Sequence, residues 1–395
     1  MRGKAEERLA RCDRCAQRRV RPRQAPPSGG LYSVRIGAPG IGYANSFSVA
    51  FISKRCTGGI GADAPPSDAP LPIPRARAPG KRFDDAPRLR ELSPMSAIDR
   101  FPALGAWRDA GEFVTVRGRR IYCRRDGAGP RLLLIHGFPT SSLDWAPIWP
   151  MLTSRFEVLT FDLLGLGFSA KPRGHRYRVS EQADLAEAVA HHYGWNAAFV
   201  LAHDYGDTVA QELLARSDQN PAHAALRVLR LCLLNGGLFP ETHRARLIQR
   251  LLASPLGPGL VGLMSRRSFA RSLNALFSPA RPLGETAIDE YWALLQHEQG
   301  LHAVPSLLGY MAERRRERSR WVGALQTTET PLRLICGALD PVSGLHMSQR
   351  YRQLVPRADV VLLDDVGHFP QLEDPDSVFA AAAAFFIGDD ERTGG

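Results

Sequence analysis

The sequence contains no apolar run as long as the roughly 18 residues that a helix needs to cross a bilayer, so no stable membrane insertion is expected. It is also poor in cysteine, with six at positions 12, 15, 56, 123, 232 and 336. Cys12 and Cys15 are spaced like a metal-binding pair, but no second pair follows nearby, so a zinc site is not expected. The scattered cysteines predict no disulfide framework and favour a reducing, cytoplasmic compartment. Neither a metal nor another cofactor is expected.

The body of the chain has almost no net charge, although the whole sequence carries +11. Residues 1–94 contain 18 Lys and Arg and 8 Asp and Glu, whereas the remaining residues contain 33 and 32. This basic leader is rich in Arg, Pro and Gly and shows no sustained apolar periodicity, so it is predicted to be disordered. Because the excess charge belongs to the leader, the composition does not predict a body that binds nucleic acid.

The leader has three possible interpretations. A transit peptide fits its arginines but not Glu6 and Glu7. A nucleic-acid-binding tail would carry interleaved aromatics or a helical pattern, and the leader shows neither. We favour the third interpretation, in which Met95 is the natural start and residues 1–94 are not part of the natural protein. N-terminal sequencing of the natural protein would decide between them.

The body alternates short apolar runs with helical patterns, which predicts a mostly parallel sheet covered by helices on both faces. Residues 112–123 alternate about a glycine-containing turn and are expected to form a β-hairpin. A helix is expected from Ser180 to Tyr193. The further strand candidates, which we expect to be buried, are residues 132–135, 156–162, 199–202, 229–235, 332–337 and 360–363. In such a sheet, ligands bind beyond the carboxyl ends of the strands.

The alternation stops between Gly236 and about Gln326, where the sequence is helix-rich. We interpret residues 236–326 as a helical lid inserted between the sixth and seventh strands, with residues 95–235 and 327–395 forming the core. Within the lid, the run Arg314–Arg320 could touch anionic lipid, but a solvated helix face is the simpler interpretation.

The most informative stretch is Phe199–Asp207. An apolar run ends in Ala202-His203-Asp204-Tyr205-Gly206, and a helical pattern follows. Small residues on either side of a sharp strand-to-helix turn are typical of a nucleophile elbow, here with Asp204 in the nucleophile position. The alternative is that Asp204 simply caps the following helix.

Two further strand ends carry the partners that a nucleophile needs. Asp340 follows the strand candidate 332–337, and His368 follows the candidate 360–363. The order nucleophile, acid, base then becomes Asp204, Asp340, His368, with each residue just past a carboxyl end. The backbone N–H groups of Phe138 and Tyr205 would form an oxyanion site.

These residues resemble the α/β-hydrolase superfamily, in the branch that contains epoxide hydrolases and haloalkane dehalogenases, whose nucleophile is Asp. Within it, the chain most resembles the mesoderm-specific transcript proteins, from about Phe101 to Ile387. The likeness lies in five segments: His203–Asp207, Asn235–Arg244, Arg320–Leu325, Leu339–Val342 and Pro370–Pro375. The resemblance implies an α/β-hydrolase fold.

An aspartate nucleophile favours attack on a saturated carbon, because the product is an alkyl ester that water can hydrolyse, whereas attack on an ester would give an anhydride. His368, oriented by Asp340, would activate that water. The expected partner is therefore a small apolar substrate. Epoxides and carbon–halogen bonds are the leading candidates.

The leaving group decides between these candidates. Epoxide hydrolases use a pair of lid tyrosines as proton donors, and Tyr310 lies in the right region for one, although a packed lid aromatic is the alternative. Tyr291, the only other lid tyrosine, does not obviously match the second. Haloalkane dehalogenases bind halide with an Asn after His-Gly and a Trp after the nucleophile, where this chain has Phe138 and Tyr205.

Epoxide hydrolysis is therefore the leading prediction, with haloalkane hydrolysis as the alternative. A non-enzymatic or lipid-related protein of the mesoderm-specific transcript type is the third possibility. The intact Asp204, Asp340 and His368 argue against an inactive scaffold. The sequence does not indicate an oligomeric state.

Overall fold

A computed structural model describes residues 102–388, and the predictions for the leader lie outside them. Within this range an eight-stranded sheet has the order β1-β2-β4-β3-β5-β6-β7-β8. The pairs β1–β2 and β2–β4 are antiparallel and all the others are parallel, as predicted. The strands span Glu112–Val116 (β1), Arg119–Asp126 (β2), Arg131–Ile135 (β3), Glu157–Phe161 (β4), Ala197–His203 (β5), Arg227–Leu234 (β6), Leu332–Gly337 (β7) and Asp359–Leu363 (β8).

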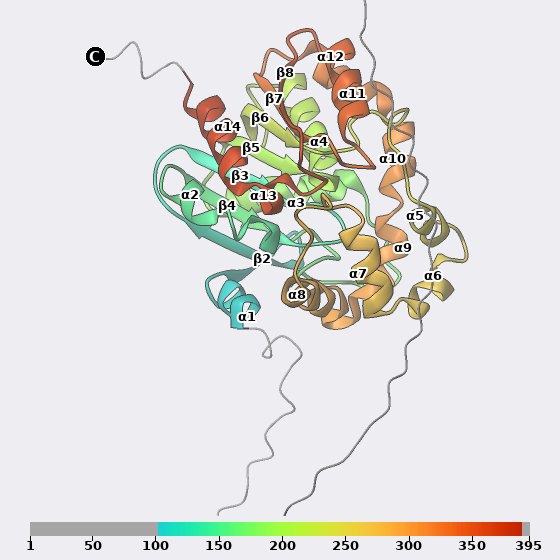
Figure 1. The fold of residues 1–395 in the computed structure, drawn as a ribbon. Coiled ribbons are helices and arrows are strands. Elements are labelled where there is room, and N and C mark those ends of the chain that lie inside the picture. The colour runs from blue at the N-terminus through green and yellow to red at the C-terminus, as the bar shows by residue number, and fades with distance from the viewer. Residues whose placement is uncertain (1–101, 389–395) are drawn as a thin grey trace, which may run out of the picture. The chain divides into compact units, whose positions relative to one another are not determined.

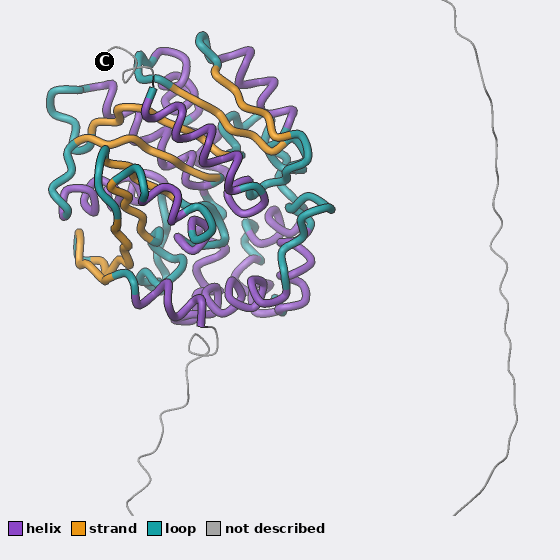
Figure 2. The backbone as a smooth tube through the Cα atoms, turned by 60° about the vertical axis from the view of Figure 1, so that its left-hand side comes forward, coloured by secondary structure: helices purple, strands orange, loops and turns teal. Residues whose placement is uncertain are grey.

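Helices cover both faces of the sheet (Figures 1 and 2). One face carries α2 (Trp149–Thr153) and α14 (Pro375–Ile387), which pack on each other. The other carries α3 (Val179–His192), α4 (Tyr205–Gln219) and α11 (Arg318–Thr327), with α4 between its two neighbours. Apolar runs such as Leu132–Ile135 are fully buried because both faces of the sheet are covered. Cys232 and Cys336 lie in this core, and neither forms a disulfide.

The prediction of a buried strand is wrong for residues 360–363. Every residue of β8 is only half-buried. The reason is its position, since β8 is the last strand in the sheet order and pairs with β7 alone. An apolar run predicts burial on both faces, but it does not reveal which strand lies at an edge.

Short helices lie between β6 and β7 in the chain, within the residues that we interpret as an insertion. In Figure 1 most of them are gathered on one side of the sheet, in yellow to orange. The helices are α5 (Leu247–Leu252), α6 (Gly257–Leu260), η3 (Val261–Leu263), α7 (Arg266–Asn274), α8 (Glu285–Gln296), η4 (His297–Ala303), α9 (Val304–Leu307), α10 (Tyr310–Arg316) and α11. The remaining helices are α1 (Pro102–Asp109), η2 (Ser142–Trp145), α12 (Leu345–Leu354) and α13 (Pro370–Glu373). No helix among residues 102–388 is long and apolar enough to cross a membrane.

Candidate active site

Asp204 lies at a sharp turn between β5 and α4. Its backbone has φ 48° and ψ −103°, a conformation that is unfavourable for a residue with a side chain. The turn also needs glycine two residues later, because a Cβ at Gly206 would lie 2.2 Å from the carbonyl oxygen of Ile135. The strained, closely packed turn expected from the sequence is therefore present.

The side chain of Asp204 does not cap α4, which removes the alternative interpretation of this motif. It is 4% exposed, and its Oδ2 accepts a hydrogen bond from the backbone N–H of Phe138 at 3.2 Å. Tyr205 is the first residue of α4, where a backbone N–H has no partner within the helix. The two residues predicted to form the oxyanion site thus adjoin Asp204.

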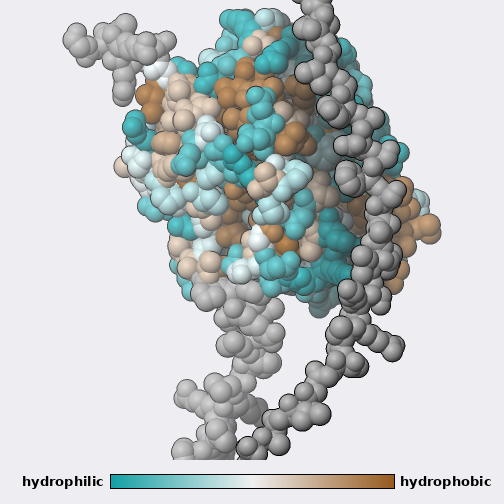
Figure 3. Space-filling view, in the orientation of Figure 1, coloured by the Kyte–Doolittle hydropathy of each residue, from teal (hydrophilic) through white to brown (hydrophobic). Residues whose placement is uncertain are grey.

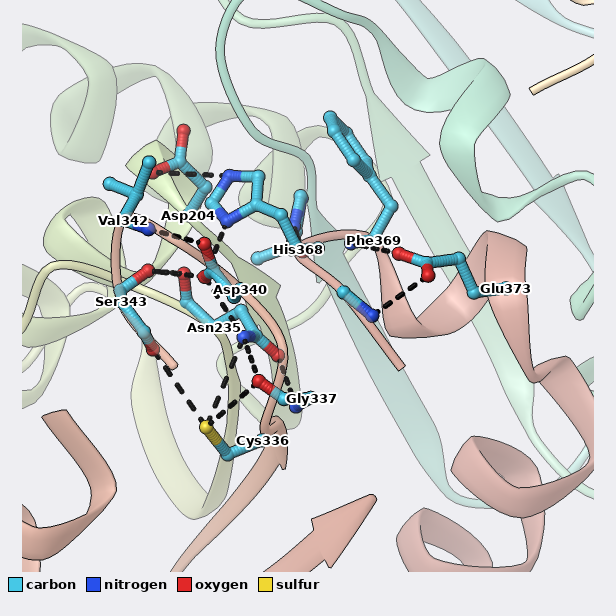
Figure 4. Close-up of polar contacts among 12 residues, drawn as sticks. Asp204, Asn235, Cys336, Gly337, Asp340, Val342, Ser343, His368, Phe369 and Glu373 are labelled. Atoms are coloured by element: carbon cyan, nitrogen blue, oxygen red, sulfur yellow. Dashed lines mark hydrogen bonds and ion pairs between the residues drawn. The ribbon is translucent and has the colours of Figure 1, made fainter. Parts of the chain in front are cut away.

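His368 and Asp340 approach Asp204 from the loops that follow β8 and β7 (Figure 4). His368 Nδ1 lies 2.7 Å from Asp340 Oδ2, and His368 Nε2 lies 4.0 Å from Asp204 Oδ1. The structure therefore brings together the three residues predicted from separate strand ends. Their order in space, with the imidazole between two carboxylates, matches a nucleophile, a base and an orienting acid.

The charges of the three groups depend on one another. Burial lowers the pKa of His368, but the charge and hydrogen bond of Asp340, and then the charge of Asp204, outweigh it and raise that pKa to about 9. Burial raises the pKa of Asp340, but the charge and hydrogen bond of His368 outweigh it and lower that pKa to about 2. The two carboxylates therefore favour the protonated form of His368, which donates from Nδ1 to Asp340.

We expect replacement of Asp204 by Asn to lower the pKa of His368 below its value of about 9. The substitution removes a negative charge 4.0 Å from Nε2, so the protonated imidazole loses part of its stabilisation. An NMR titration of the ring nitrogens in both proteins measures the shift. Asp365→Asn, which alters an exposed carboxylate nearby in sequence, is the control. An unchanged His368 pKa in the Asp204→Asn protein would contradict this coupling.

Asn235 holds Asp340 in place. Its Nδ2 donates to Asp340 Oδ2 at 3.0 Å and to the carbonyl of Gly337 at 3.1 Å, while its Oδ1 accepts from the Gly337 N–H at 2.8 Å. The N–H of Val342 donates to Asp340 Oδ1 at 2.7 Å, and the Ser343 hydroxyl lies 2.8 Å from Oδ2 (Figure 4). Sequence reasoning did not assign a role to Asn235, although it begins one of the five segments that carry the resemblance.

The loop that carries His368 is held by Glu373, which sequence reasoning also left without a role. Its Oε2 accepts from the N–H of Gly367 and from that of Ser278, both at 2.8 Å, and its Oε1 accepts from the N–H of Phe369 at 3.1 Å. The backbone N–H of His368 donates to Leu276 at 2.9 Å. The loop is therefore bound to residues 276–278 of the insertion.

The interpretation of Arg314–Arg320 as a solvated face is wrong for Arg314. This side chain is 2% exposed, its Nη2 donates to the Asp204 carbonyl at 3.1 Å, and its Nε donates to the Thr208 hydroxyl at 2.6 Å. A run of charges predicts a solvated helix face, because the local sequence does not reveal the contacts that its side chains make with distant residues. Three other arginines of the run do reach the surface and pair with glutamates: Arg316, Arg318 and Arg320.

Tyr310 lies next to the site. Its ring centroid is 4.8 Å from that of Tyr205 and 6.3 Å from that of Phe138. Burial, followed by the charge of Asp204, raises the pKa of its hydroxyl, which therefore stays protonated at neutral pH. Tyr291 is buried beside the carboxyl of Asp144. Of the two lid tyrosines, Tyr310 is the one that packs on Tyr205, the residue after Asp204.

A mostly apolar cavity of about 340 Å³ leads to Asp204 and His368. The insertion supplies most of its wall, and Phe138 and Val342 belong to the core side. Tyr310 is not among the lining residues. The other lining residues are Pro139, Arg246, Ile248, Gln249, Leu251, Leu252, Leu260, Leu263, Met264, Ser268, Phe269, Ser272, Leu273, Leu276, Leu295, Val304 and Leu308. A cavity of this size and character suits a small apolar molecule.

The comparisons with known proteins identify the family and the fold. The family model for the α/β hydrolase fold matches residues 130–375. The mesoderm-specific transcript homolog protein of Bos taurus is 44% identical over 285 residues, which cover 69% of this chain and 85% of that protein. The putative hydrolase LipZ of Mycobacterium tuberculosis is 39% identical over 287 residues, covering 72% of this chain and 99% of LipZ.

Solved structures show the same fold. The haloalkane dehalogenase DbeA from Bradyrhizobium elkani superposes with a TM-score of 0.60 at 23% identity, covering 72% of this chain and 99% of DbeA. The resemblance inferred from the sequence motifs is confirmed by the family match and the relatives. The chain belongs to the α/β-hydrolase fold family.

Proposed function

We propose that this α/β hydrolase cleaves a bond at a saturated carbon through a covalent ester on Asp204, and that its substrates are small apolar epoxides. The observation that carries the proposal is the position of His368, between the carboxylates of Asp340 and Asp204 at the end of an apolar cavity. A carboxylate nucleophile in a cavity with few polar groups suits a neutral electrophile.

In the first step, an Asp204 oxygen attacks an epoxide carbon and the carbon–oxygen bond of the ring breaks. The leaving oxygen takes a proton, for which the Tyr310 hydroxyl is the proposed donor. The imidazolium form of His368 stabilises the Asp204 carboxylate before the attack, and the product of this step is a neutral ester.

In the second step, Asp204 no longer carries a negative charge, because its carboxylate has become an ester. The negative charge that helped to raise the pKa of His368 has gone, so His368 can return its proton to the phenolate that the first step leaves on Tyr310, and the neutral imidazole can then act as a base. It then takes a proton from a water that attacks the carbonyl carbon of the ester. The N–H groups of Phe138 and Tyr205 stabilise the oxyanion, whose collapse releases the diol and restores the Asp204 carboxylate.

The side chains of Phe138 and Tyr205 argue against a halide as the leaving group. Where haloalkane dehalogenases place Asn and Trp to bind halide, this chain has an aromatic hydrocarbon and a phenol whose ring packs on Tyr310. Neither side chain has an N–H group, so together they do not reproduce the pair of side-chain N–H donors that binds halide. The similarity to DbeA is a likeness of fold and does not bear on the leaving group.

The test incubates the wild-type chain and the Asp204→Asn variant with panels of epoxides, haloalkanes and p-nitrophenyl esters. We expect the wild type to turn over epoxides and the variant to turn over none of the three. Haloalkane turnover instead would favour the alternative leaving group. Ester hydrolysis that survives in Asp204→Asn would show that the nucleophile lies elsewhere, and no turnover at all would favour a non-enzymatic or lipid-related role.

Tyr310→Phe is expected to reduce epoxide turnover by about 10²-fold, because an alkoxide needs a proton and a halide does not. The measurement is kcat for an epoxide, and for a haloalkane if one is accepted. Tyr193→Phe is the matched control, since that hydroxyl donates to Glu112 at the surface. Unchanged epoxide kinetics would assign Tyr310 to packing alone.

A further inference from the structure

The insertion contains a long stretch without a single acidic residue. Between Glu241 and Glu285 the sequence has no Asp or Glu, but it has seven arginines: Arg244, Arg246, Arg250, Arg266, Arg267, Arg271 and Arg281. We call residues 242–284 the acid-free segment. Since the body outside the leader is close to neutral, this segment concentrates positive charge on one part of the fold.

The same segment contains the most exposed large apolar side chains of the described residues. Leu247 is 72% exposed, Leu256 is 70% and Leu263 is 79%, and Ile248 and Leu251 are also exposed. Single exposed leucines are common on soluble proteins, but five neighbours on α5, the turn to α6 and η3 are not. Figure 3 shows hydrophobic colour at the right-hand edge of the molecule, where Figure 1 places α5 and α6.

Several arginines of the segment are available to bind an anion. Arg244, Arg250, Arg267 and Arg271 are exposed, and none has a carboxylate oxygen within 4.0 Å among residues 102–388. Elsewhere in the described part of the chain, arginines such as Arg318 and Arg333 do pair with acids. The exposed leucines and the unpaired arginines thus occupy the same short segment.

We propose that this apolar and basic face, formed by the exposed leucines and unpaired arginines of the acid-free segment, docks on an anionic lipid bilayer. Leucines of this exposure gain by entering the acyl boundary, and arginines on the same segment bind the lipid phosphates. A protein partner would also cover the leucines. The absence of any acid over 43 residues favours a uniformly negative surface over a protein surface of mixed charge.

The face also adjoins the cavity. Ile248, Leu251 and Leu263 are exposed and at the same time line the cavity that leads to Asp204 and His368. A docked bilayer would therefore meet the wall of the cavity, and an apolar molecule dissolved in the lipid would reach the site without crossing water. Docking itself does not depend on the proposed chemistry, because it needs neither Asp204 nor turnover.

The test measures sedimentation of the full chain with vesicles of phosphatidylcholine, with and without phosphatidylglycerol. We expect binding that requires phosphatidylglycerol and weakens as salt is added. The double variant Arg250→Glu/Arg267→Glu should bind at least about 30-fold more weakly, since each basic residue near such a surface contributes about 1 kcal/mol. Leu247→Ser/Leu256→Ser should also bind more weakly, although its charge is unchanged.

The controls separate this face from the basic leader, which every variant retains. Arg155→Glu/Arg227→Glu changes the same charge at exposed positions near the amino ends of β4 and β6, and Leu345→Ser removes an exposed leucine of α12. Both controls should bind like the wild type. Asp204→Asn should also bind like the wild type, so that vesicle binding is tested independently of the proposed catalytic function.

Two results would overturn the proposal. One is equal loss of binding in Arg250→Glu/Arg267→Glu and in its control, which would attribute binding to overall charge. The other is a wild-type chain that ignores both kinds of vesicle. If light scattering then shows self-association that Leu247→Ser/Leu256→Ser abolishes, the face is an interface between copies of the chain.

Discussion

Replacement of His368 by glutamine is expected to stop the proposed reaction after its first step and to leave the substrate attached to Asp204. Attack by the carboxylate needs no base, whereas hydrolysis of the ester needs a group that takes a proton from water. Turnover should fall by about 10²–10⁴-fold, the usual contribution of a general base. Intact-mass spectrometry after incubation with an accepted epoxide should show one added substrate mass.

Peptide mapping should place that mass on Asp204. His191→Gln, a change at an exposed position near the end of α3, is the control and should turn over without accumulating an adduct. Asp204→Asn should show neither turnover nor adduct. If the His368→Gln protein loses activity and carries no adduct, the covalent ester is not an intermediate.

Replacement of Arg314 by methionine is expected to lower kcat by roughly 10- to 100-fold, and to lower the free energy of unfolding by about 1–3 kcal/mol. The guanidinium binds the carbonyl of Asp204, whose backbone is strained, and the hydroxyl of Thr208 one turn later. Without it the turn can relax and the carboxylate can leave its position near His368. We therefore expect Arg314 to act as a positioning residue.

If Arg314→Met affected only stability, kcat would be unaltered at denaturant concentrations below the unfolding transition. We therefore measure kcat and KM under those conditions, and the free energy of unfolding by denaturation. Arg316→Met is the control from the same helix, because its side chain is exposed and pairs with Glu317 at 3.0 Å and with the buried Glu313 only at 3.9 Å. It should change the free energy of unfolding by no more than about 0.5 kcal/mol. Equal kcat values for Arg314→Met and Arg316→Met would rule out a role at the turn.

Much of the fold follows from local sequence because burial on both faces leaves wholly apolar runs. Leu132–Ile135 is such a run, and Leu332–Gly337 is one apart from Arg333. The carboxyl ends of these strands indicate where functional residues should meet. Asp340 and His368 could be placed by this rule alone. The half-burial of β8 could not be predicted, because the position of a strand within the sheet depends on the whole topology.

The residues that support the site were harder to predict because their roles depend on contacts across the fold. Arg314 is separated from Thr208 by 106 positions, and Asn235 from Asp340 by 105. A charge run predicts a solvated face, and the asparagine that ends the strand candidate 229–235 has no role that its local sequence reveals. Only the tertiary structure shows that one residue is buried behind Asp204 and that the other binds Asp340.

The carboxylate of Glu373 restricts how the insertion can move relative to the loop that carries His368. It binds Ser278 of the insertion and, with the same oxygen, Gly367 of the loop that carries His368. The backbone of His368 is further tied to Leu276. If the insertion bent at a point after residue 278, residues 276–278 would move with it and would pull His368 away from Asp204. A movement of the insertion that keeps the site intact must therefore leave residues 276–278 in place beside the loop that carries His368.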